Sequence, residues 1–184
     1  MSKGNLLVIS GPSGVGKGTI VKELIKLRPE TSLSISCTTR LPRVGEEEGK
    51  SYFFLTKEQF EDKLSRGGFL EYSQHFDNYY GTPRAFVEEK LEQGDVILEI
   101  DVDGALQVKS AMPSAVLIMI APPDKSALYA RLKGRGTEGE DVITRRMDRA
   151  DYELSKSNLY DYVIINDDLN TAVAEVVKIS DKEN

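Results

Sequence analysis

The chain has 184 residues, a length that fits one domain with a substantial buried core. Its apolar content of 40% and charged content of 29% are typical of soluble globular proteins, and its net charge of −6 argues against nucleic acid or an anionic membrane as a partner. One cysteine, Cys37, and one histidine, His75, exclude an intrachain disulfide and a Cys/His metal centre. We expect a cytoplasmic protein, because the apolar run at residues 6–9 is too short for a signal peptide or membrane span. The sequence leaves open whether it is a monomer or a homo-oligomer.

Short apolar runs recur along the chain at residues 6–10, 96–100, 115–120 and 162–165. They do not alternate with polar residues, which is typical of parallel strands that are buried on both faces. Helical patterns separate them at residues 16–27, 84–92 and 124–133, and Asp124 is suited to cap the last of these helices. The order predicts an α/β fold with a doubly wound, mainly parallel sheet that is flanked by helices.

Two segments interrupt this alternation. The first is polar and rich in aromatic residues, with one helix that begins at Thr56; Thr56 and Gln59 form a capping box, and Phe60 and Leu64 form the inward face. The second is helical and densely charged. We expect one domain over residues 1–184, with a core of about 1–35, 85–125 and 157–184 and mobile insertions at about 36–84 and 126–156. Both insertions are expected at the carboxyl ends of the strands, where open α/β sheets bind ligands.

A glycine-rich segment joins the first predicted strand to the first predicted helix. Its glycines allow backbone N–H groups to surround phosphate, and Lys17 can reach the terminal phosphates of a nucleoside triphosphate. The residues expected to bind ATP are Gly11, Ser13, Gly14, Val15, Gly16, Lys17, Gly18 and Thr19. Gly18 occupies the position where Ser or Thr commonly binds Mg²⁺, so direct ligation by Thr19 is in doubt. We expect the cofactor Mg²⁺ to be held mostly by water and phosphates.

Two further features have more than one interpretation. Arg40 and Arg43 flank a rigid Leu-Pro step, which suits two guanidinium forks on one anion, although such pairs are more often simply exposed. The run at residues 96–101 carries Glu99 and Asp101 near its carboxyl end, where phosphate-loop proteins often anchor hydrated Mg²⁺. The sequence leaves open which of these two acids serves the metal, and we favour Asp101 for the base of the acceptor.

An ordered set of motifs extends over nearly the whole chain. It consists of Gly16-Lys17-Gly18-Thr19, Ser36, Thr38-Thr39-Arg40, Pro42-Arg43, Gly45-Glu46, Gly49, Tyr52, Phe69-Leu70-Glu71, Asn78-Tyr79-Tyr80-Gly81-Thr82, Ile100-Asp101, Gly134-Arg135-Gly136-Thr137, Arg146 and Ile165-Asn166-Asp167-Asp168. This set resembles the guanylate kinases, which belong to the nucleoside-monophosphate kinases with a P-loop. The resemblance implies phosphoryl transfer from ATP to GMP in purine metabolism, giving ADP and GDP.

The resemblance also assigns residues to the acceptor GMP. It implies that the phosphate is held by Arg40, Arg43, Tyr52 and Tyr80, and that guanine is surrounded by Ser36, Glu71, Thr82 and Asp101. Glu71 suits guanine because the N1–H and amino group are adjacent donors, whereas adenine presents an acceptor at N1. Such a site can discriminate by about 10⁴-fold, because the wrong base leaves buried polar groups unpaired.

The second insertion is crowded with the arginines Arg131, Arg135, Arg145, Arg146 and Arg149. The resemblance implies that Arg135 and Arg146 act with Lys17 in catalysis, as a lid that neutralises phosphate charge. Arg131 is a weaker candidate, and surface ion pairs account for the others. Asn166 and Asp167 are expected to contact the adenine of ATP, with a simple turn as the alternative.

Two single residues are not assigned to catalysis. His75 is expected at the surface or in a loop, and neither His75 nor Cys37 lies in a pattern that indicates acyl transfer. Phosphoryl transfer needs no protein nucleophile.

Three alternatives remain at this point. The chain could phosphorylate another monophosphate, such as AMP or a pyrimidine nucleotide. It could be a non-catalytic binding module on the same fold, although such modules tend to lose the glycines or the lysine that this chain keeps at Gly11, Gly14, Gly16 and Lys17. A nucleotide-dependent switch is the weakest alternative, because no base-recognition motif of that class is found.

Overall fold

The computed structural model describes residues 3–134 and 139–183. Its central sheet has the strand order β2-β7-β1-β8-β9, and all neighbouring strands are parallel. The strands are β1 (Leu6–Ser10), β2 (Ser32–Leu33), β7 (Val96–Glu99), β8 (Val116–Ala121) and β9 (Tyr162–Ile165). The predicted runs at 6–10 and 162–165 are confirmed as strands, and those at 96–100 and 115–120 are shifted by one residue at one or both ends. The short strand β2 was not predicted.

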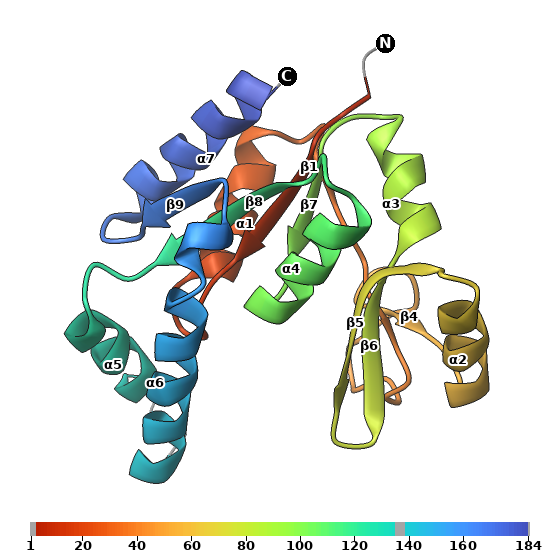
Figure 1. Cartoon of the computed structure of the whole chain (residues 1–184), viewed down its shortest axis with the longest axis horizontal. Coiled ribbons are helices and arrows are strands. Elements are labelled where there is room, and N and C mark those ends of the chain that lie inside the picture. Colours follow the sequence, from red (N-terminus) through yellow and green to blue (C-terminus); the bar gives the residue numbers. More distant parts are fainter. Residues whose placement is uncertain (1–2, 135–138, 184) are drawn as a thin grey trace.

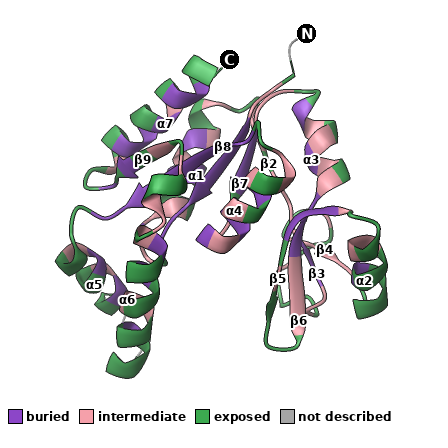
Figure 2. Ribbon diagram, viewed as in Figure 1, coloured by how far each residue is buried: buried purple, intermediate pink, exposed green. Residues whose placement is uncertain are grey.

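Helices cover both faces of this sheet (Figure 1). Leu7 and Ile9 of β1 pack in one apolar cluster with α1 (Lys17–Leu27) and α7 (Leu169–Glu183). Leu6 and Val8 point the other way, into a second cluster with α3 (Arg84–Leu91) and α4 (Val102–Ala111). Side chains alternate along a strand, so a fully apolar β1 must be buried on both sides. Figure 2 shows these strands buried in the middle of the molecule. The predicted doubly wound α/β fold is confirmed.

Residues 36–84 form a second, separate sheet with the order β4-β3-β6-β5. Its strands are β3 (Cys37–Thr38), β4 (Phe53–Phe54), β5 (Phe69–His75) and β6 (Asn78–Pro83), and α2 (Lys57–Ser65) packs beside them. Phe60 of α2 is fully buried and stacks on Phe69, with ring centroids 4.3 Å apart. The predicted capping box is confirmed, because Thr56 and Gln59 each accept a hydrogen bond from the backbone of the other.

Residues 126–156 contribute to a pair of helices, α5 (Lys125–Lys133) and α6 (Glu140–Leu154), followed by a short 3₁₀ turn at Ser157–Leu159. Leu128 and Leu132 of α5 pack against Ile143 and Ala150 of α6 in a small core of their own. Asp124 caps α5 as predicted and accepts a 2.7 Å hydrogen bond from the backbone N–H of Ala127.

The helix pair and the second sheet both lie at the end of the central sheet where its strands end (Figure 1). They lie on opposite sides of that end, with α4 between them. Open α/β sheets bind ligands at the carboxyl ends of their strands, so both segments border the region where ligands are expected. Within the described residues, no helix is both long and apolar enough to cross a membrane.

Candidate active site

The glycine-rich loop between β1 and α1 borders a cavity of about 610 Å³. The cavity is lined by Ser13, Gly14, Gly16, Lys17, Gly18, Thr19, Lys22, Glu23 and Glu99. Gly11 has φ of 139°, and a Cβ at this position would lie 2.2 Å from the carbonyl oxygen of Ile120. Only glycine fits there. The side chain of Val15 is fully buried, so only the backbone of this residue is available to a ligand in the cavity.

Lys17 is held over the loop. Its Nζ donates to the carbonyl oxygen of Gly11 at 2.5 Å and to that of Pro12 at 3.2 Å. The ammonium group therefore stays at the edge of the cavity. An anion entering the cavity meets this charge together with the N-terminus of α1.

Residues from two distant elements brace the back of the loop. The Nδ2 of Asn166, after β9, donates to the carbonyl oxygen of Val15 at 2.8 Å. Arg131 of α5 donates to the same oxygen at 3.2 Å and to the carbonyl oxygen of Asn166 at 2.8 Å. Asn166 is only 7% exposed, whereas Asp167 is exposed. Arg131, the weaker candidate of the sequence, is thus in direct contact with the loop.

The two acids near the end of β7 lie in different cavities. Glu99 lines the phosphate-loop cavity, and its Oε1 lies 3.4 Å from where a Cβ of Gly18 would be. Burial raises the pKa of Glu99, while the charge of Lys17 lowers it. Asp101 lines a second cavity and caps α4, accepting a 2.8 Å hydrogen bond from the N–H of Gly104. Residues two apart on a strand face the same side, but the chain leaves the strand after Glu99 and this separates the two carboxylates.

The second cavity, of about 200 Å³, lies between the second sheet and the start of α4. It is lined by Ser36, Tyr52, Glu71, Ser73, His75, Tyr80, Gly81, Ile100 and Asp101. The structure therefore brings together five residues that the resemblance assigned to GMP: Ser36, Tyr52, Glu71, Tyr80 and Asp101. They come from segments spread over more than sixty positions of the sequence.

Glu71 is the most buried acid of this cavity, with 7% of its surface exposed. Its Oε1 accepts a 2.6 Å hydrogen bond from the Oγ1 of Thr82, which is itself fully buried. Burial raises the pKa of Glu71 and the nearby charge of Asp101 raises it further, while the hydrogen bond from Thr82 lowers it. A Cβ at Gly104 would lie 3.2 Å from Glu71 Oε2 and 3.3 Å from Asp101 Oδ1. The two carboxylates thus lie side by side at the start of α4.

Arg40 lies beside the two tyrosines of the cavity. Its guanidinium carbon is 5.5 Å from the ring centroid of Tyr52, and the rings of Tyr52 and Tyr80 meet edge to face at 6.2 Å. Glu46 holds Arg40 in this place, because Nη2 donates to both carboxylate oxygens at 2.8 and 3.0 Å. This contact also lowers the pKa of Glu46. Arg43 donates to Glu46 only through its backbone N–H, and its side chain is exposed on the loop.

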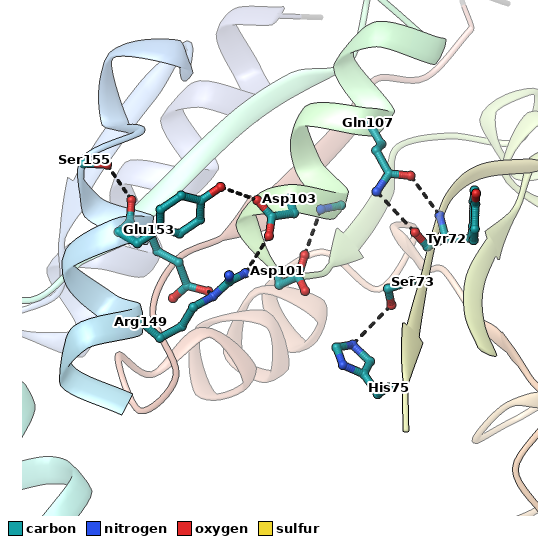
Figure 3. A network of polar contacts seen from close by, with 11 residues as sticks. Tyr72, Ser73, His75, Asp101, Asp103, Gln107, Arg149, Glu153 and Ser155 are labelled. Carbon is teal, nitrogen blue, oxygen red and sulfur yellow. Dashed lines mark hydrogen bonds and ion pairs between the residues drawn. The ribbon is translucent and has the colours of Figure 1, made fainter. Parts of the chain in front are cut away.

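The helix α6 carries Arg146, one of the two predicted catalytic arginines, next to the phosphate loop. The Nη1 of Arg146 lies 3.5 Å from the Oγ of Ser13, and a cavity of about 200 Å³ separates α6 from the loop. Arg149 instead pairs with Asp103 of α4 and with Glu153, as Figure 3 shows. Arg135, the other predicted catalytic arginine, lies outside the described residues.

Comparison with known proteins agrees with this geometry. The family model described as "Guanylate kinase" matches residues 3–183. The chain belongs to the guanylate kinase family. It is 49% identical to the guanylate kinase of Clostridioides difficile (strain 630), over 100% of this chain and 90% of that protein. The guanylate kinase of Prochlorococcus marinus subsp. pastoris is 48% identical, over 95% of both chains. The crystal structure of guanylate kinase from Anaplasma phagocytophilum covers 100% of this chain and 87% of its own, with a TM-score of 0.75 and 32% identity.

The site of this guanylate kinase family member contains residues to which the sequence reasoning gave no role. Glu46 was part of a motif, and its ion pair with Arg40 could have been suspected because this acid follows Arg40 and Arg43 closely in the sequence. Ser73 and His75 line the second cavity together with Glu71. Their signal was the alternation Glu71, Ser73, His75, which puts three polar side chains on one face of a strand. His75 is exposed as expected, but it lies on β5 and not in a loop.

Members of the guanylate kinase family usually need a divalent metal for phosphoryl transfer. Among the described residues, no cluster of three or more His, Cys, Asp or Glu side chains could hold such an ion. The phosphate-loop cavity is lined by the carboxylates of Glu23 and Glu99 and by the hydroxyls of Ser13 and Thr19. These hard oxygen donors fit an ion that takes its remaining ligands from phosphates and water.

Proposed function

We propose that this member of the guanylate kinase family transfers the γ-phosphoryl group of ATP to the phosphate of GMP, giving ADP and GDP. One structural observation supports this reaction in addition to the family membership. The phosphate-loop cavity and the cavity that contains Glu71 and Asp101 lie beside the same end of one sheet, and the chain runs from Glu99, the last residue of β7, in the first cavity to Asp101 in the second. A donor and an acceptor nucleotide would thus meet above the end of β7.

On the donor side, the loop from Gly11 to Thr19 holds the phosphates of ATP, and Lys17 contacts the terminal ones. Asn166 and Asp167 form the adenine end of the site; the contact of Asn166 with Val15 supports this, because it joins that end to the loop. Glu99 and Thr19 would help to hold Mg²⁺ together with water and phosphates, and the ion would compensate the clustered phosphate charge.

On the acceptor side, Arg40, Arg43, Tyr52 and Tyr80 hold the phosphate of GMP. The support for this clamp is the position of Arg40 between Glu46 and the two tyrosines. An incoming phosphate dianion can replace Glu46 as the partner of the guanidinium, which then makes charge-assisted hydrogen bonds to it. Arg43 completes the clamp when its loop closes.

Guanine occupies the other end of the acceptor cavity, bordered by Ser36, Glu71, Thr82 and Asp101. Its N1–H and amino group donate to the carboxylate of Glu71, which Thr82 holds in place by a 2.6 Å hydrogen bond. Adenine has an acceptor at N1 and no amino group at C2, so the buried carboxylate would keep its bond from Thr82 but receive no donors from this edge of the base. This difference favours GMP over AMP.

Transfer requires the two nucleotides to approach each other in line. Residues 36–84 carry the acceptor and residues 126–156 form the lid, and closure of both excludes water that would hydrolyse ATP. Arg146, already near Ser13, and Arg135 neutralise charge on the transferred group together with Lys17. The acceptor phosphate is ionised at neutral pH, so no general base is needed. We propose a cytoplasmic role in purine nucleotide metabolism, and the acidic net charge supports small-molecule substrates over nucleic acid as partners.

The test is a product analysis with the purified protein, ATP, Mg²⁺ and GMP. Separation of the nucleotides by ion-exchange chromatography should give GDP and ADP in equal amounts. Release of ADP and inorganic phosphate without GDP would contradict the proposal.

A further inference from the structure

The acceptor cavity has a polar edge that the guanine and phosphate contacts do not use. Glu71, Ser73 and His75 alternate along β5, and all three line the cavity. Side chains two positions apart on a strand share a face and are about 7 Å apart. Ser73 and His75 therefore continue the row of polar groups that begins at the carboxylate of Glu71.

Each residue of this row has a defined neighbour on β6. Thr82 is paired with Glu71 at the guanine end, and Tyr80 is paired with Ser73. The ring of His75 lies 5.8 Å from the ring of Tyr80. Ser73 thus comes next to the carboxylate assigned to the base along β5 and lies opposite the tyrosine assigned to the phosphate on β6. In any nucleotide the sugar lies between base and phosphate.

Ser73 and His75 are joined to each other. The Oγ of Ser73 lies 3.2 Å from the Nε2 of His75 (Figure 3). With the imidazole proton on Nε2, His75 donates to Ser73, and the hydroxyl hydrogen of Ser73 is left to donate into the cavity. The histidine then fixes the direction of the serine hydroxyl.

The strand itself is fixed against the helix that carries Asp101. The side chain of Gln107 in α4 accepts from the backbone N–H of Tyr72 and donates to its carbonyl oxygen, both at 3.2 Å. Tyr72 and Gln74 are exposed. The face with Ser73 is therefore held toward α4, where Asp101 completes the cavity.

We propose that Ser73 and His75 form the sugar side of the acceptor site: Ser73 contacts a ribose hydroxyl of the bound monophosphate, and His75 is the positioning residue that orients Ser73. This role presupposes that GMP is the acceptor. The pair then adds a preference for a ribonucleotide over a deoxyribonucleotide, which the contacts to guanine and phosphate cannot supply.

The test compares GMP with 2′-deoxy-GMP and 3′-deoxy-GMP as acceptors for wild type and four variants. We expect wild type to prefer GMP over at least one deoxy analogue. Ser73→Ala should raise KM for GMP by about 3- to 10-fold, the factor that a neutral hydrogen bond supplies, and leave KM for that analogue and for ATP unchanged. His75→Phe keeps a ring beside Tyr80 but loses Nε2, and should act in the same direction.

Two variants serve as controls. Ser73→Thr keeps the hydroxyl and should retain the preference, and Gln74→Ala, on the opposite face of β5, should match wild type. Thermal melting of each variant establishes that it is folded. An equal loss with GMP and both analogues, or no loss with Ser73→Ala, would overturn the assignment to the sugar. Failure of wild type to phosphorylate GMP would instead contradict the proposed function.

Discussion

Arg149 of α6 and Asp103 of α4 form an ion pair, with Nη2 of the arginine 2.6 Å from Oδ2 of the aspartate. The pair joins the lid helices to α4, the same helix whose first residues border the acceptor cavity. Tyr152 adds a 3.0 Å hydrogen bond to the other oxygen of Asp103, and Arg149 also donates to Glu153 at 3.1 Å (Figure 3). The helix α4 thus contacts both α6, through Asp103, and β5, through Gln107.

The first prediction concerns this ion pair. Both side chains are more than 40% exposed, so solvent screens the attraction and a double-mutant cycle of Asp103→Asn and Arg149→Gln should give a coupling free energy of at most about 1 kcal/mol. The hydrogen bond from Arg149 holds the pKa of Asp103 below its usual range. The coupling free energy is therefore fully present above the pKa of an aspartate in the unfolded chain. It is lost as the pH falls through the lower pKa of Asp103 in the folded protein.

Urea unfolding of the four proteins of this cycle at pH 7, and at several lower pH values, measures the coupling. A coupling that grows as the pH falls would contradict the assignment to this ion pair.

The second prediction concerns Lys17. Lys17→Ala should lower kcat by about 10²-fold or more, because it removes a charge that faces the developing negative charge on the phosphates. GMP binding, measured by calorimetry, should stay close to wild type, since the acceptor cavity does not include Lys17. Lys26→Ala, in the last turn of the same helix, is the matched control and should leave both quantities unchanged. Near-normal turnover of Lys17→Ala would refute the role of the loop.

The third prediction concerns the stability of the protein without ligand. Burial raises the folded pKa of Glu71, so its contribution to stability is present at low pH and is lost as the pH rises through that value. Glu71→Gln keeps an acceptor for Thr82 and removes the buried charge. We expect it to raise the melting temperature at pH 7, with a gain that shrinks as the pH falls through the raised pKa of Glu71 and is absent below the usual range of a glutamate.

The matched control is Glu175→Gln, an exposed position of α7, which should show no such pH-dependent gain. A melting temperature for Glu71→Gln below that of wild type at pH 7 would show that the carboxylate stabilises the empty site.

The fourth prediction concerns Gly104, which separates the two acceptor-side carboxylates. A Cβ here would lie 3.2 Å from Glu71 and 3.3 Å from Asp101, so both side chains must shift by a few tenths of an ångström. Alanine is favoured over glycine in a helix by about 1 kcal/mol, which offsets this strain. Gly104→Ala should therefore fold with nearly unchanged stability but bind GMP about tenfold more weakly, since displaced hydrogen-bond partners cost about this factor.

Denaturation and GMP titration, with Ser110→Ala on the same helix as the control, separate these two effects. Unchanged GMP affinity of Gly104→Ala would mean that the two carboxylates do not contact the nucleotide together.

The parts of the fold that could be predicted are those with a local cause. The strand β1, the glycine loop and the helix α1 follow from an apolar run, three glycines and a helical pattern that are adjacent in sequence. The second sheet could not be predicted in the same way. Its strands Cys37–Thr38 and Phe53–Phe54 have only two residues each, and they exist because distant segments pair with them.

The candidate site follows the same division. The resemblance pointed to Glu71 and Asp101, and the structure brings both into one cavity. The separation of Glu99 from Asp101 needed coordinates, because it depends on where the chain leaves β7. The bracing of Val15 by Arg131 also needed them, since 116 positions separate these residues. His75 was given no role because no sequence pattern around it indicates catalysis, and only the structure shows that it lines the acceptor cavity.

The most direct test of the central claim is the rate of ADP release with GMP, AMP, CMP and UMP as acceptors, for wild type and for Glu71→Gln. Wild type should use GMP with a kcat/KM about 10⁴-fold above that for AMP, because only guanine donates to the buried carboxylate. Glu71→Gln should lower kcat/KM for GMP by about 10- to 100-fold, the factor expected for a hydrogen bond to a charged group, and leave the low rate with AMP nearly unchanged. A wild type that prefers AMP, or a GMP/AMP ratio that Glu71→Gln does not change, would contradict the account.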